Sequence, residues 1–182
     1  PEPHQRTPKT PAPNPPPEDP NPTLFFYYPD EKPYGIFCQW HPSPFTVPTT
    51  SLQFMMCAKA LYFADYAAAA RILASKAPKE QQALGATVAG FSSEAWGRVE
   101  PGEQRMVKER VVEQGNWYKF TQNRALREVL LGTGERELAE AGSKDRTWGI
   151  GYTAKNAENY RAYWGANLLG GCLMRVRGRI RE

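Results

Sequence analysis

A single lysine stands in a long apolar stretch of the chain. Residues 52–63 read LQFMMCAKALYF, and Lys59 is the only Lys, Arg, Asp or Glu between Pro33 and Ala64. Around it, apolar residues recur three, four and seven positions apart, which is the spacing of one face of a helix. We therefore expect Lys59 to lie on the apolar face of that helix.

Two interpretations of Lys59 follow from its position. In the first, its aliphatic stem packs on the helix while the ammonium reaches water or pairs with a distant carboxylate. In the second, the amine lines a cleft, where desolvation lowers its pKa from the usual value of about 10.4. A neutral amine is a nucleophile that can form a Schiff base with an aldehyde or a ring-opened sugar. The residues alone leave both interpretations open.

Two carboxylates and a glycine-rich segment follow later in the chain. Glu140 and Asp145 flank a turn that leads into residues 148–151, WGIG. Cleavage of a glycosidic bond needs an acid or base and stabilisation of an oxocarbenium-like sugar, although a pair of solvated surface carboxylates has the same pattern. Residues 164–171, WGANLLGG, offer small residues at the start of a helix. These suit either close approach of a ligand, with phosphate at the helix N-terminus, or close helix packing.

Composition narrows the class of protein. The chain has 182 residues, 41% of them hydrophobic, and a net charge of +4, which suits one domain and mildly favours an anionic partner. Its three cysteines, at positions 38, 57 and 172, form no CxxC pair, and it has two histidines. We therefore expect no disulfide framework, no structural zinc and no metal site based on histidine. Since no uninterrupted apolar run is long enough for a membrane span, we expect an intracellular protein, cytoplasmic or nuclear.

The chain divides into an arm and one domain. Residues 1–22 hold ten of the seventeen prolines and form a proline-rich arm, and residues 23–182 form the domain. We predict a mainly helical α+β fold with a few short strands. Thr50 should begin the first helix with a capping box to Gln53, and Asp65 should cap the second. The expected helices are about 51–63, 65–75, 79–88, 103–114, 117–131 and 158–179, and the expected strands are 23–28, 45–47, 136–141 and 148–152.

Six blocks in fixed order resemble a known family. They are FCQWHPSPF at 37–45, FMMCAKA at 54–60, WYKFTQN at 117–123, LLGTG at 130–134, DRTWGIG at 145–151 and WGANLLG at 164–170. Together they resemble the NADAR family, the YbiA-like N-glycosidases, over most of the chain outside the arm. The resemblance implies the fold of that family and cleavage of an N-glycosidic bond without a metal or cofactor.

The resemblance also implies a substrate class. Members of the family remove ADP-ribose from guanine bases of nucleic acid, and others act on phosphorylated ribosylamino-pyrimidine intermediates of riboflavin synthesis. We expect ADP-ribose, or ADP-ribosylated guanine in DNA or RNA, to be the partner of this chain, with the riboflavin intermediate as the alternative. The residues do not indicate an oligomeric state.

The family motifs place roles on particular residues. The reactive amine falls on Lys59, with Lys119 as the rival, and proton transfer falls on Asp145 or Glu140. Trp148 would stack on the base, and residues 149–151 with the Gly165 region would accommodate ribose or pyrophosphate. The full set of expected substrate-binding residues is Gln39, Trp40, Leu52, Lys119, Asn123, Trp148, Gly149, Gly151 and Asn167.

One departure from the family pattern bears on activity. The family usually has a glutamate seven residues before the helix lysine, and this chain has Leu52 there. A leucine can neither accept a proton nor bond a ribose hydroxyl. Either another carboxylate, Glu140 or Asp145, substitutes for it, or the chain is a weak enzyme or an inactive module that binds ADP-ribose. Gln39, where the family often has asparagine, retains an amide.

Overall fold

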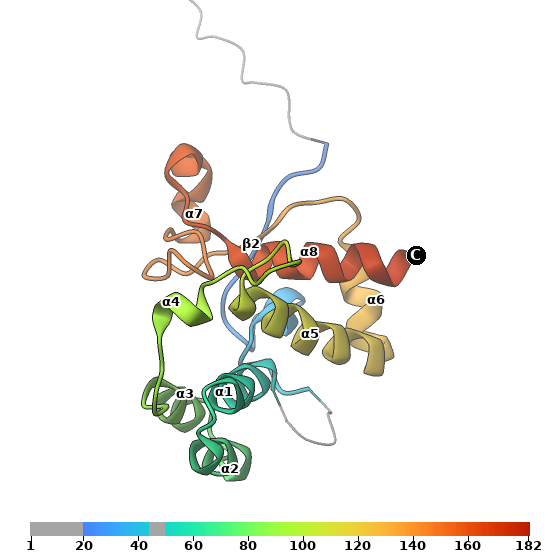
Figure 1. Cartoon of the computed structure of the whole chain (residues 1–182). Helices are drawn as coiled ribbons and strands as arrows, with labels where there is room; N and C mark the ends of the chain where they lie inside the picture. The colour runs from blue at the N-terminus through green and yellow to red at the C-terminus, as the bar shows by residue number, and fades with distance from the viewer. Residues whose placement is uncertain (1–19, 44–49) are drawn as a thin grey trace, which may run out of the picture.

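The structure is a computed structural model that describes residues 20–43 and 50–182. Nearly all of the proline-rich arm, and the strand expected at 45–47, lie outside the described residues. The elements, in chain order, are β1 (Leu24–Phe26), η1 (Tyr34–Phe37), α1 (Ser51–Tyr62), α2 (Tyr66–Ala74), α3 (Pro78–Ala86), α4 (Ser93–Trp96), α5 (Val107–Gln122), α6 (Arg124–Gly132), β2 (Leu138–Glu140), α7 (Ala154–Ala157), η2 (Glu158–Tyr163) and α8 (Leu168–Arg181) (Figure 1). The predicted mainly helical α+β fold with short strands is confirmed.

Two short parallel strands join the beginning of the domain to its last third. Leu24 pairs with Leu138 and Phe26 pairs with Glu140, and β2 is the strand expected within 136–141. A parallel pair needs a long crossover connection, and here residues 27–137 provide it. The pairing places the loop after Phe26 beside the end of β2, where Glu140 stands.

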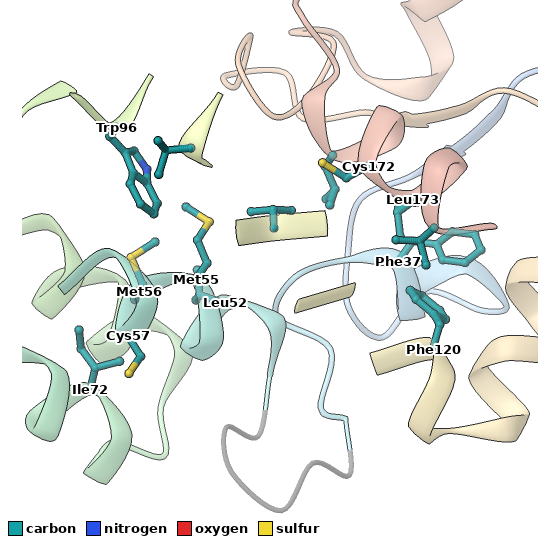
Figure 2. Close-up of a cluster of buried hydrophobic side chains, with 14 of the residues drawn as sticks. Phe37, Leu52, Met55, Met56, Cys57, Ile72, Trp96, Phe120, Cys172 and Leu173 are labelled. Atoms are coloured by element: carbon teal, nitrogen blue, oxygen red, sulfur yellow. The ribbon is translucent and has the colours of Figure 1, made fainter. Parts of the chain in front are cut away.

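Helices surround this strand pair in two groups. In Figure 1, α1, α2 and α3 lie together at the bottom of the view, while α8 runs beside β2 with α5 beneath it. Figure 2 shows the cluster between them, with Leu52, Met55 and Met56 on α1 and Cys172 and Leu173 on α8. Burial of these side chains is the main force that holds the helices together.

The caps of α1 and α2 explain where these helices begin and how they are joined. Thr50 accepts a hydrogen bond from the backbone N–H of Gln53 at 3.0 Å, and Asp65 accepts one from Ala68 at 2.9 Å, as predicted. Nε2 of the Gln53 side chain donates to the carbonyls of Ile72 and Ser75, at 2.9 and 3.0 Å, and so satisfies the C-terminal end of α2.

The helix break expected near Gly115 does not occur. The helix α5 continues through Gly115 to Gln122, and the chain breaks at Asn123 before α6. A Cβ at position 115 would lie 2.8 Å from a ring carbon of Phe54, so this glycine lets α5 approach α1 closely. Its purpose is packing between helices, which the local sequence does not reveal.

Two predictions about the last third of the domain were wrong. The helix expected at 158–179 is divided, because residues 164–167 are not helical and Asn167 has a positive φ of 48°. The strand expected at 148–152 is a series of bends. In both cases the chain turns so that it packs against the end of β2. Among the described residues, no helix has the length and apolar character that crossing a bilayer requires.

Two glycines of α8 give a matched pair of substitutions. A Cβ at Gly170 would lie 2.0 Å from the carbonyl oxygen of Leu138, whereas a Cβ at Gly178 would have no heavy atom within 4 Å. We predict that Gly170→Ala lowers the free energy of unfolding by roughly 3 kcal/mol, because α8 must move away from β2. Gly178→Ala should raise it by about 0.5 kcal/mol, because alanine favours the helix. Urea unfolding of both variants measures this, and equal effects would contradict the packing described here.

Candidate active site

A cavity of about 340 Å³ opens where the loop after β1, the loop after η1, α1 and the end of β2 meet. Its walls combine apolar and aromatic side chains with two carboxyl groups. The lining residues are Tyr27, Tyr28, Pro29, Cys38, Gln39, Trp40, Leu52, Met55, Met56, Gln82, Glu140, Asp145 and Trp148. The sequence prediction included six of them as site residues, namely Gln39, Trp40, Leu52, Glu140, Asp145 and Trp148.

Glu140 is the last residue of β2, and its backbone is fixed on three sides. It pairs with Phe26 in the sheet, its N–H donates to Oδ1 of Asn167 at 3.1 Å, and its carbonyl accepts from Ile150 at 2.9 Å. Oε2 of its side chain is shielded from solvent and has no hydrogen-bond partner among residues 20–43 and 50–182. Burial, and then the neighbouring Asp145, raise the pKa of Glu140 to about 7. This carboxyl group can therefore both give and take a proton at neutral pH.

Asp145 supplies the second carboxyl group from the loop after β2. Its Oδ1 accepts hydrogen bonds from the backbone N–H groups of Thr147 and Trp148, both at 2.8 Å. This Asx-type turn is local, and it fixes the carboxylate and the Trp148 ring on the same loop. Tyr27 lines the same cavity as Glu140 and Asp145. Burial raises the pKa of Tyr27, and the neighbouring Tyr28, Glu140 and Asp145 raise it further.

The segment after η1 forms another wall and is held from behind. The carbonyl of Gln39 accepts from Leu52 N–H at 3.0 Å, and the carbonyl of Cys38 accepts from Nζ of Lys119 at 3.2 Å. The side chain of Gln39 is 9% exposed, and its Oε1 has no partner within the described part of the chain. Lys119 is fully buried on α5, and this burial lowers its pKa to about 7. Lys119 supports the wall and is not part of the lining.

Lys59 lies on α1 one turn beyond Met55 and Met56, and it does not line the cavity. Its Nζ donates to the carbonyl of Gly85 at 2.8 Å and lies 3.7 Å from the centroid of the Phe91 ring. Burial lowers its pKa. The amine satisfies one of the orphan carbonyls at the end of α3, and so it joins α3 to α1. The reactive role of Lys59 stays a prediction.

The glycines at positions 149, 151 and 165, which were expected to leave room for a ligand, lie against other parts of the protein. A Cβ at Gly149 would lie 2.7 Å from the carbonyl oxygen of Glu140, and one at Gly165 would lie 2.4 Å from that of Arg146. Gly151 has a φ of +79°, and a Cβ there would lie 2.7 Å from the Arg146 side chain. These glycines allow the loop after β2 to pack tightly behind the site. They do not face open space that a ligand could fill.

Two predicted asparagines hold the framework of the site. Asn167 bonds the edge of β2 that faces away from β1, because its Nδ2 also donates to the carbonyl of Leu138 at 2.9 Å. It therefore behaves as a short third strand that positions Glu140. Asn123 donates to the carbonyl of Lys119 at 2.8 Å, at the junction of α5 and α6. Neither side chain lines the cavity.

Sequence reasoning missed several lining residues. Tyr27 and Tyr28 belong to an aromatic run that indicated a strand, but β1 ends at Phe26 and both rings turn to the cavity rim. Met55 and Met56 were assigned to the core face of α1, and Gln82 carried no signal. In the described ranges, no three His, Cys, Asp or Glu side chains gather in a way that could hold a metal ion.

The fold and the cavity together define a mainly helical α+β domain with two carboxyl groups in an aromatic pocket. Residues 25–181 match the model of the NADAR domain, so the chain belongs to the NADAR family. It is 33% identical to an N-glycosidase of Acanthamoeba polyphaga mimivirus over 167 residues, which cover 85% of this chain and 94% of the relative. It is 30% identical to an N-glycosidase of Nostoc punctiforme over 164 residues, which cover 88% and 94%.

A solved structure has the same fold. The NMR structure of the Escherichia coli protein YbiA superposes with a TM-score of 0.62 at 23% identity, covering 88% of this chain and 86% of that protein. The predicted YbiA-like fold is confirmed.

The raised pKa of Glu140 predicts a pH dependence of stability. Its pKa is about 7 in the folded protein and near 4.5 when the chain is unfolded. Between these values the unfolded state binds fewer protons, so stability falls as pH rises from 4.5 to 7, by roughly 3 kcal/mol in all. Lys119 does not interfere, since its lowered pKa acts between 7 and 10.5.

Unfolding titrations between pH 4.5 and 7 measure this loss. Glu140→Gln should lack it, and the exposed control Glu128→Gln should retain it. A loss of the same size in Glu140→Gln would show that another group causes it.

Proposed function

We propose that this chain is an N-glycosidase that hydrolyses the bond between a ribose and the nitrogen of a base. The observation that carries the proposal is the Glu140 carboxyl group, which is buried beside Asp145 in a cavity of nucleoside size and whose Oε2 has no partner among residues 20–43 and 50–182. A carboxyl group with a pKa near 7 is suited to general acid catalysis at neutral pH. The two relatives named N-glycosidase, similar over nearly their whole length, support the same activity.

The two carboxyl groups divide the chemistry between them. Protonated Glu140 gives its proton to the leaving nitrogen as the bond from that nitrogen to C1 of the ribose breaks. The carboxylate of Asp145 stabilises the positive charge that develops on the sugar and takes a proton from the attacking water. The water oxygen becomes the hydroxyl group on C1. The products are the free sugar and the base, and the enzyme is restored when Asp145 releases its proton to solvent and Glu140 takes one up.

The rest of the lining suits a flat base. Trp40 and Trp148 offer aromatic faces, and Met55 and Met56 offer polarisable thioethers that adapt to a ring. We propose ADP-ribose linked to guanine in DNA or RNA as the substrate. Tyr28, 62% exposed at the rim, could stack on a neighbouring base of a nucleic acid strand.

Full-length protein incubated with an ADP-ribosylated guanine oligonucleotide tests the activity. We expect release of ADP-ribose, with kcat/KM falling above about pH 7 as Glu140 loses its proton. Glu140→Gln and Asp145→Asn should each lower kcat/KM about 10²- to 10⁴-fold, because each removes a proton-transfer group. Glu128→Gln, an exposed change on α6, should leave it unchanged.

A second candidate function rests on Leu52. This side chain lines the cavity at the position of the family glutamate and is 5% exposed. An ADP-ribose-binding module would bind ADP-ribose in calorimetry and release nothing from the oligonucleotide after long incubation. That result would contradict the proposed hydrolysis. If the Leu52→Glu variant then releases ADP-ribose while the unchanged protein does not, the missing carboxylate is the cause of the inactivity.

A Schiff base on Lys59 is the competing covalent route. In that route the amine displaces the base at C1 of the ring-opened ribose, and water later hydrolyses the imine. The carboxylate route predicts no adduct when borohydride is added during turnover, because Nζ of Lys59 is bonded to Gly85. It also predicts that Lys59→Met lowers the free energy of unfolding by about 1–3 kcal/mol, since Gly85 loses its partner. If mass spectrometry finds a reduced ribosyl adduct on Lys59 or Lys119, the covalent route replaces the carboxylate route.

A further inference from the structure

We propose that the cavity binds the base and ribose of its substrate as an uncharged unit, and that the 5′-phosphate of that ribose stays outside the lining. This inference rests on the proposed function for the identity of the ligand as a ribosylated base. It adds that the site selects against a phosphate monoester within the cavity.

The first reason for this proposal is the charge of the cavity lining. The lining holds two carboxyl groups and contains no Lys, Arg or His among the described residues. The two buried lysines nearby are turned to backbone carbonyls, Lys119 to Cys38 and Lys59 to Gly85. A phosphate placed beside Asp145 would meet a like charge without a compensating cation, which costs several-fold to a hundredfold in affinity at short range.

The second reason is the hydrogen-bonding character of two buried polar atoms in the lining. Oε1 of Gln39 and Oε2 of Glu140 are both shielded from solvent, and neither has a partner among the described residues. Oε1 of Gln39 and the carboxylate of Asp145 accept hydrogen bonds, and Oε2 of Glu140 accepts them when the group is ionised, as at pH 8. Ribose hydroxyls and the amino groups of bases are donors, whereas phosphate oxygens at neutral pH are acceptors. A nucleoside therefore satisfies these atoms, and a phosphate leaves them unsatisfied.

The size of the cavity agrees with this assignment. Its volume of about 340 Å³ lies at the lower end of the range of roughly 300–1,000 Å³ that is usual for ligand sites. One nucleoside fits this space, and a complete ADP-ribose linked to a base does not. The pyrophosphate of such a substrate must therefore continue past the rim into solvent.

Calorimetry with two inert probes, guanosine and guanosine 5′-monophosphate, tests the proposal without any turnover. We expect the phosphate to contribute no affinity because it lies outside the lining, so guanosine 5′-monophosphate should bind no tighter than guanosine at pH 8, where Glu140 is ionised. Tighter binding of the monophosphate, or no binding of guanosine up to millimolar concentration, would each overturn the proposal.

A cation added to the lining gives a positive control. Gln82 lies on the exposed side of α3 and lines the cavity, so Gln82→Lys should fold and raise the affinity for the monophosphate at least tenfold. Gln122→Lys, an exposed change at the end of α5 outside the lining, should leave both affinities unchanged. If Gln82→Lys has no more effect than Gln122→Lys, charge does not control selection.

The outcome is separable from that of the proposed function. Binding of guanosine at least as tight as that of the monophosphate, without ADP-ribose release from the oligonucleotide, would sustain this inference and reject hydrolysis. ADP-ribose release by a protein that prefers the monophosphate would do the reverse.

Discussion

The site depends on the burial of one carboxyl group, that of Glu140, whose Oε2 has no hydrogen-bond partner in the part of the chain that the structure describes. An unpaired polar atom shielded from water is costly, and the cost for an ionised carboxylate is larger still, so the group shifts its pKa upward instead. Glu140 cannot escape this cost by moving, because Phe26, Ile150 and Asn167 fix its backbone on three sides. The strand pair, the turn before α8 and the tight glycines behind the loop all contribute to that restraint. Their common effect is a proton donor held ready at neutral pH.

Whereas Glu140 makes one side of the cavity polar, α1 keeps another side apolar and rigid. Gln53 bonds the end of α2, and Lys59 bonds the end of α3. Both are polar side chains buried among hydrophobic ones, and each satisfies carbonyls that a helix end leaves open. These two bonds fix the rotation of α1, and so they fix which of its side chains reach the cavity. A buried polar residue on this helix thus shapes the site without touching a ligand.

Local signals predicted the parts of the site that depend on local chemistry. Thr50 and Asp65 begin their helices as their side chains require, and Glu140 and Asp145 come together because a turn separates them. The position of Lys59 could not be resolved in the same way. Helical periodicity places it on the apolar face of α1, but that face is divided between the cavity and the contact with α3, one turn apart. Only the packing of α3 decides between them.

The glycines show even more clearly that a local sequence does not reveal which distant segment packs against a residue. Gly115 looked like a helix break and Gly149 like a ligand cradle, whereas the structure uses each for contact with a distant segment, Phe54 and Glu140 respectively. The freedom of a glycine is visible in a sequence, but the neighbour that needs the space is not.

Titration of the Glu140 carboxyl group itself tests the central claim most directly. Carbon-13 labelling of glutamate, with Glu140→Gln to assign the signal, allows NMR to follow this group from pH 3 to 9 in the folded protein. The account predicts a midpoint near pH 7. A midpoint near 4.5, the value of a solvated glutamate, would show that water or an unrecognised partner reaches the side chain, and the proposed acid would be lost.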